Sequence, residues 1–104
     1  MRVTISHNRS KEDVIQSVDR SFDQIFQAGA LPVRLTITQR NWQGSTLNFF
    51  LTAKMGLVST PIQGTVAVTD SDLTIDVDLG ILGRLVPTET VRDVIASRVK
   101  GLLK

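Results

Sequence analysis

The middle and the two ends of this chain follow different hydrophobic periods. Between residues 33 and 79, apolar side chains mostly alternate with polar ones, which is the pattern of half-buried strands. Over 11–28 and 88–103 they recur instead every three or four positions, as along one face of an amphipathic helix. Alternating residues do not form one face of a helix, and residues three or four apart do not form one face of a strand. The sequence therefore predicts an α+β fold.

Five strands are expected, one before the first helix and four in succession before the last: residues 1–7, 33–42, 47–53, 62–69 and 73–79. A turn at Gln43 and Gly44 joins the second strand to the third, and Asp70 to Asp72 turn the chain before the fifth. The order β-α-β-β-β-β-α predicts a single mainly antiparallel sheet with both amphipathic helices packed on one face. Residues 1–104 are expected to form a single α+β domain.

Signals for helix ends agree with the hydrophobic stripes. Ser10 and Asp13 have the spacing of a capping box, and Gly29 stands where a left-handed residue would end the first helix. Pro87 opens the last helix. Phe22 and Ile95 lie on the two stripes and are predicted core residues.

Composition narrows the class of protein without naming a partner. Of the 104 residues, 41% are hydrophobic and 21% are charged, which is typical of a globular chain. The absence of cysteine excludes disulfides and thiolate metal sites, and it fits a reducing, cytoplasmic location. The net charge of +2 comes from scattered lysines and arginines, with no block that would follow a nucleic-acid backbone.

No transmembrane segment is expected. The start MRVTISHNRSKEDV lacks the apolar region of a signal peptide. The longest apolar run, in LGILGRLV, is interrupted by Arg84 and is too short to span a bilayer. A cytoplasmic protein is therefore expected.

Residues of the kinds used in catalysis are present but form no predicted site. Asp76 and Asp78 share one face of a strand at a spacing of roughly 7 Å, which a hydrolytic carboxylate pair could use. That face is expected to be solvated, so the pair is assigned to solubility. The acidic stretch 70–72 is explained by a turn, and His7 is the only histidine. No catalytic residue, metal or cofactor is predicted, and the protein is expected not to be an enzyme.

Phe50 and Ala67 are placed by strand parity on the sheet face away from the helices. There they are candidates for a homodimer contact, although isolated exposed apolar residues are common in monomers. Trp42 and Phe49 add two more aromatic rings, but Phe49 is expected in the core and no nucleic-acid-binding motif is present. No nucleic-acid partner is predicted.

Two segments predicted as connections are unusually apolar: AKMGLVSTPIQG, residues 53–64, and LGILGRLVP, residues 79–87. In an antiparallel meander both lie at the same edge of the sheet, so they are expected to be neighbours. Their apolar side chains form a candidate hydrophobic contact: Met55, Leu57, Val58, Ile81, Leu82, Leu85 and Val86. The cluster either completes the core or docks on a partner, with Leu57 and Leu82 predicted as its outermost part.

Several turn and core positions in this region form a recurring pattern. They are a W-x-G-x-x-L hairpin, a glycine before an apolar loop, a G-x-V-x-V strand and an LG pair: Trp42, Gly44 and Leu47; Gly56; Gly64, Val66 and Val68; Leu79 and Gly80. With the start VTISHNRSKEDV and the amphipathic last helix, the chain resembles the polyhydroxyalkanoic acid system proteins, a family of small granule-associated bacterial proteins. The similarity covers nearly the whole chain. It implies association with storage polyester granules or their metabolism, and no active site.

The leading hypothesis is a non-enzymatic cytoplasmic protein that associates with polyester granules or granule proteins through the two apolar segments. The alternative is a small carrier that binds a lipid-like or acyl ligand between the helices and the sheet. A copurifying acyl ligand would favour the carrier.

Overall fold

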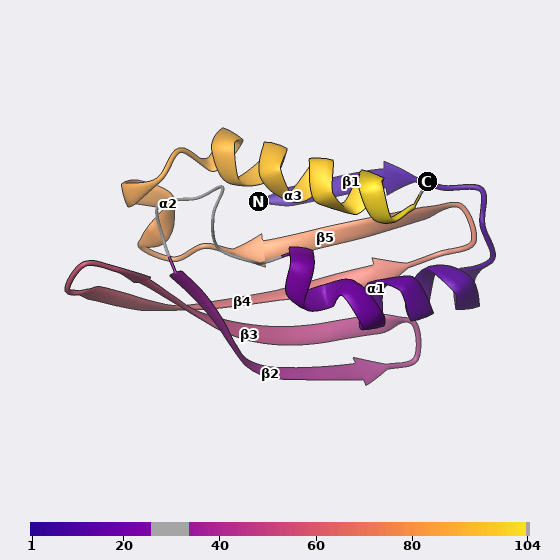
Figure 1. The fold of residues 1–104 in the computed structure, drawn as a ribbon, viewed down its shortest axis with the longest axis horizontal. Helices are drawn as coiled ribbons and strands as arrows, with labels where there is room; N and C mark the ends of the chain where they lie inside the picture. The colour runs from indigo at the N-terminus through magenta and orange to yellow at the C-terminus, as the bar shows by residue number, and fades with distance from the viewer. Residues whose placement is uncertain (26–33, 104) are drawn as a thin grey trace.

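The computed structural model describes residues 1–25 and 34–103, which form a five-stranded sheet and three helices (Figure 1). The elements in chain order are β1 (Arg2–Ser6), α1 (Lys11–Ile25), β2 (Arg34–Gln43), β3 (Thr46–Met55), β4 (Val58–Val68), β5 (Asp72–Asp78), α2 (Leu82–Leu85) and α3 (Thr88–Leu102). Neighbouring strands are all antiparallel, in the order β1-β5-β4-β3-β2. The predicted α+β class and element order are confirmed, and α2 is an additional short helix inside the second apolar segment.

α1 and α3 cover the same face of the sheet, as their stripes predict (Figure 1). Phe22 and Ile95 are both buried in the core that these helices share with the strands. The strands contribute alternate residues to that core, for example Leu47, Phe49 and Leu51 of β3. Residues 26–28 of the predicted first helix, and its predicted terminator Gly29, lie outside the described residues.

Arg9 joins the start of α1 to the end of α3. Its guanidinium donates to the Asp13 carboxylate, to Ser17 Oγ at 2.9 Å and to the Leu102 carbonyl oxygen at 3.0 Å. The hydrogen bond from Arg9 lowers the pKa of Asp13. Because that pKa is depressed in the folded state, the stability from this pair is present at neutral pH and is lost as the pH falls through the lowered value.

Gly64 is required where the sheet packs against an aromatic pair. Phe49 is the cross-strand partner of Gly64, and its ring meets Phe22 of α1 edge to face, with centroids 5.1 Å apart. A Cβ atom at Gly64 would lie 2.6 Å from Phe49 Cζ and 2.7 Å from the Asp76 carbonyl oxygen. The second contact is with backbone, so it cannot be relieved by a side-chain rotation.

Gly64→Ala is therefore expected to lower the free energy of unfolding by about 2 to 3 kcal/mol, measured by urea denaturation. Gly101→Ala is the matched control, since a Cβ atom there meets nothing within 4 Å and alanine favours a helix. That variant is expected to be neutral or stabilised by up to about 1 kcal/mol. If both variants are equally stable, the steric clash inferred for a Cβ atom at Gly64 is contradicted.

The first apolar segment is not the loop that the sequence predicts. β3 continues to Met55 and β4 begins at Val58, so only Gly56 and Leu57 form the turn. Gly56 has a φ of 59°, and no non-glycine residue in the described chain has a positive φ. A positive φ at the first central residue alone is the pattern of a type II′ hairpin turn. Gly44 and Ser45 form the same kind of two-residue turn between β2 and β3, one position later than predicted.

β4 is longer than its neighbour β5, and Pro61 explains where the pairing ends. The last pair between these strands is Gln63 with Asp78. The Val68 amide donates to Ser45, so even-numbered residues of β4 bond toward β3 and odd-numbered residues toward β5. Pro61 therefore lacks its N–H on the side where β5 would continue, and it leaves an edge that does not favour further pairing.

Candidate apolar contact surface

The β3–β4 hairpin extends beyond the end of β5, and its tip also lies beyond the last β2–β3 pair, Arg34 with Lys54 (Figure 1). We call residues 51–62, which lie past the last β4–β5 pair, the β3–β4 projection. At about 3.3 Å per residue, β4 runs on for about 16 Å from Gln63 to its first residue, Val58. The opposite end of the sheet carries the β2–β3 and β4–β5 turns, so the two ends of the molecule differ in shape (Figure 1).

Leu57 stands at the tip of this projection with an exposed fraction of 105%. Beside it Val58 is exposed and Met55 is half-buried, and the two are cross-strand partners. A fully exposed leucine side chain contributes no burial energy to the fold. The tip therefore presents apolar surface to the solvent.

The second apolar segment divides into an inner and an outer side. Residues 82–85 form one helical turn, so positions four apart share a side. Leu82 and Val86 are 2% and 3% exposed and belong to the core, whereas Ile81 and Leu85 are each 47% exposed. The prediction that Leu82 is an outermost residue is therefore wrong, because helical spacing turns it inward.

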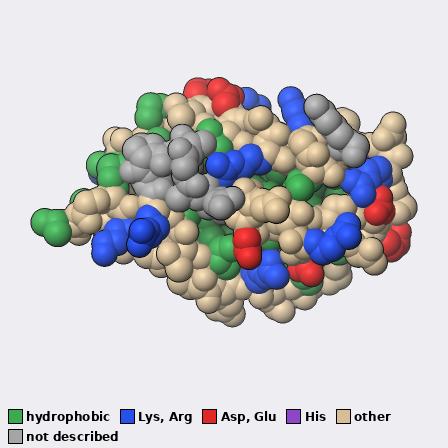
Figure 2. All heavy atoms as spheres, viewed as in Figure 1, with side chains coloured by type: hydrophobic (Ala, Val, Ile, Leu, Met, Phe, Trp, Pro, Cys, Tyr) green, Lys and Arg blue, Asp and Glu red, His purple; other side chains and the backbone are tan. Residues whose placement is uncertain are grey.

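The two apolar segments meet only in part. A Cβ atom at Gly80 would lie 3.6 Å from the Pro61 carbonyl oxygen and from Thr60 Oγ1, so the second segment begins against the side of the projection. Leu57 extends beyond that contact and does not join a common cluster. Figure 2 shows hydrophobic side chains at this end of the molecule, including one at the extreme tip. The seven predicted residues thus separate into buried, flanking and tip positions.

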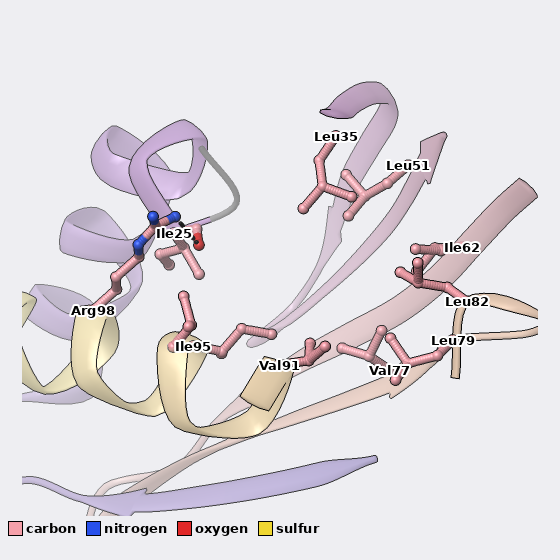
Figure 3. A pocket seen from close by; sticks show the side chains of 11 residues that line it. Ile25, Leu35, Leu51, Ile62, Val77, Leu79, Leu82, Val91, Ile95 and Arg98 are labelled. Carbon is pink, nitrogen blue, oxygen red and sulfur yellow. Dashed lines mark hydrogen bonds between the residues drawn. The ribbon is translucent and has the colours of Figure 1, made fainter. Parts of the chain in front are cut away.

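A small apolar cavity lies between the helices and the sheet. Its volume is about 20 Å³, room for about one water molecule. Aliphatic side chains from α1, α2, α3 and the strands converge on it, and Figure 3 shows Leu82 among them. Arg98 lies at its margin and donates to the carbonyl oxygens of Gln24 and Ile25 at 3.2 and 3.1 Å.

The open face of the sheet carries polar side chains around Phe50. Two open hollows of about 320 and 420 Å³ flank this half-exposed ring, and Asp78 lines both. Arg2 forms an ion pair with Asp76 at 2.9 Å, and Asp78 Oδ1 accepts from the Gly80 amide at 3.1 Å. Both carboxylates thus have conventional structural partners. Within the described residues no group of three or more His, Cys, Asp or Glu side chains is placed to hold a metal ion.

Changing Asp76 and Asp78 together to Asn is expected to alter the free energy of unfolding by less than about 1 kcal/mol. The Arg2 pair is exposed and surface pairs contribute little, while Asn retains the oxygen that accepts from Gly80. Thermal and urea denaturation of the double variant measure the effect. A loss above about 2 kcal/mol would mean that the pair has a role that its exposure does not indicate.

His7 has a structural role that sequence reasoning missed. Its Nε2 lies 2.9 Å from the Thr69 carbonyl oxygen, and its Nδ1 accepts from the Arg9 amide at 3.2 Å. Since Nδ1 accepts, Nε2 carries the proton in this arrangement. The ring fastens the end of β1 to the end of β4, a pairing that only the sheet order reveals.

No known family model and no curated protein matches this sequence. None of the described helices is long and apolar enough to cross a membrane.

Proposed function

We propose that this protein is a non-enzymatic, cytoplasmic component of the polyhydroxyalkanoate system that associates with storage polyester granules or granule proteins. The observation that carries the proposal is Leu57, fully exposed at the tip of the β3–β4 projection. Burying one such side chain in an apolar surface contributes about 1.5 to 3 kcal/mol. Val58 and Met55 flank it and would add to the contact. The resemblance of the chain to the polyhydroxyalkanoic acid system proteins supports polyester as the surface.

Adsorption to particles tests this proposal. The purified protein is expected to sediment with amorphous poly(3-hydroxybutyrate) particles and to remain in solution with hydrophilic silica particles of equal area. The difference is expected because only the polyester surface removes the apolar side chains of the tip from water. Equal partitioning to both particles, or to neither, would contradict the proposal.

The carrier alternative rests on the cavity between the helices and the sheet. At about 20 Å³ this cavity is far smaller than the several hundred Å³ of ordinary ligand pockets, so an acyl chain would require the helices to separate. Native mass spectrometry of the freshly purified protein distinguishes the two functions. A bound acyl species would favour the carrier, and the mass of the unliganded chain favours surface association. If the protein forms homodimers, Phe50 and Ala67 on the open face are the proposed contact.

A further inference from the structure

The β3–β4 projection carries positive charge as well as apolar surface. Arg34 of β2 and Lys54 of β3 are directly opposite each other, and both are exposed. Lys54 alternates with the inward-facing Ala53, so both cations lie on the open face of the sheet beside the tip. On the helix side of the molecule, Figure 2 also shows basic side chains near the hydrophobic tip and no acidic side chain at that end of the view.

This pair is unfavourable for folding. Like charges directly opposite each other on neighbouring strands destabilise a sheet. Within the described residues neither cation has an ion pair, and residues 51–62 contain no Asp or Glu. β4 itself has no acid, and Asp78 of β5 is paired with Gln63, about 16 Å from the start of β4. An anion supplied from outside the protein would relieve this repulsion.

We infer that the projection binds an anionic phospholipid interface, with Leu57 inserted among the acyl chains and Arg34 and Lys54 on the phosphate groups. This inference rests on the proposed function, because it uses the same tip as the apolar anchor. Long basic side chains beside an apolar anchor are the usual arrangement of interfacial attachment, in which the stems lie along apolar surface and the charges reach the headgroups. The partner surface is thus negatively charged as well as hydrophobic.

Vesicle cosedimentation tests this inference. The protein is expected to bind vesicles of phosphatidylglycerol and phosphatidylcholine in equal parts more tightly than pure phosphatidylcholine, and added salt should weaken the binding. Each basic residue near an anionic surface raises the partition coefficient about 5-fold, so Arg34→Gln with Lys54→Gln should lower it about 25-fold. Folding stability of this double variant should be unchanged or slightly higher, because the like charges are gone.

Lys11→Gln with Lys100→Gln is the matched control. It removes the same charge from the start of α1 and the end of α3, at the other end of the molecule (Figure 1). This variant should retain the preference for anionic vesicles within about 2-fold. If both double variants lose binding to anionic vesicles equally, the effect comes from net charge alone and the inference is overturned.

The polyester measurement separates the two proposals. If wild-type protein adsorbs to polyester but binds both kinds of vesicle equally, the inference of an anionic interface is wrong and the proposed function stands. If it adsorbs to neither polyester nor vesicles, both are wrong. Both proposals are supported if the wild-type protein adsorbs to polyester and the double variant at Arg34 and Lys54 binds anionic vesicles about 25-fold more weakly.

Discussion

Leu57→Asp is expected to reduce adsorption to polyester particles at least about 100-fold without unfolding the protein. The variant loses the burial energy of one leucine and adds a carboxylate that would have to leave water at the contact. These two effects together exceed the roughly 3 kcal/mol that corresponds to 100-fold. Since the Leu57 side chain is fully exposed in the folded protein, the free energy of unfolding should change by less than about 0.5 kcal/mol.

Two further variants make this result interpretable. Asn41→Asp adds the same charge at an exposed position of β2 near the opposite end of the sheet, and it should adsorb like the wild-type protein. Leu82→Asp places a charge in the core, so it should lose stability first and adsorption only as a consequence. Full adsorption by a stably folded Leu57→Asp protein would show that the tip is not the contact.

Phe22→Ala is expected to have the largest effect on stability, about 3 to 5 kcal/mol. The ring is fully buried, meets Phe49 edge to face, and lies 5.6 Å from the Arg40 guanidinium carbon above it. Truncation leaves a cavity and removes both aromatic contacts. Domains of this size are stabilised by only about 5 to 15 kcal/mol, so the loss should be plain in urea denaturation.

Phe50→Ala is the control for this substitution, because Phe50 lies on the neighbouring position of β3 but faces the open side of the sheet. It should cost about 1 kcal/mol, since much of the ring is already in water. If Phe22→Ala costs no more than Phe50→Ala, the assignment of the two sheet faces is wrong.

The helices and most strand positions could be predicted because their apolar residues follow one period over long stretches. Phe22 and Ile95 are where the stripes place them, and Phe50 lies on the predicted open face. The loop predicted for the first apolar segment is wrong because that prediction overlooks Gly56 as a turn residue. The rule that a glycine marks a two-residue hairpin turn finds Gly44 and applies equally to Gly56. With a turn there, Met55, Val58 and Ile62 take inward-facing positions of two adjoining strands.

The burial of Leu82 was also within reach of the sequence. Leu82 and Val86 are four residues apart, as are Ile81 and Leu85, which is the pattern of two sides of a helical turn. Two features were not accessible. The pairing of β1 with β5 joins residues far apart in the chain, and the exposure of Leu57 depends on where β5 stops relative to β4. Both are set by the sheet order, which local periodicity does not determine.

A polarity-sensitive fluorophore at the tip tests the central claim most directly. The chain has no cysteine, so Leu57→Cys provides a unique attachment site, and Asn41→Cys provides the same label near the other end of the sheet. On addition of polyester particles, the emission of the label at position 57 is expected to shift to the blue as it leaves water, while the label at position 41 stays unchanged. A blue shift at position 41, with none at position 57, would contradict docking through the projecting tip.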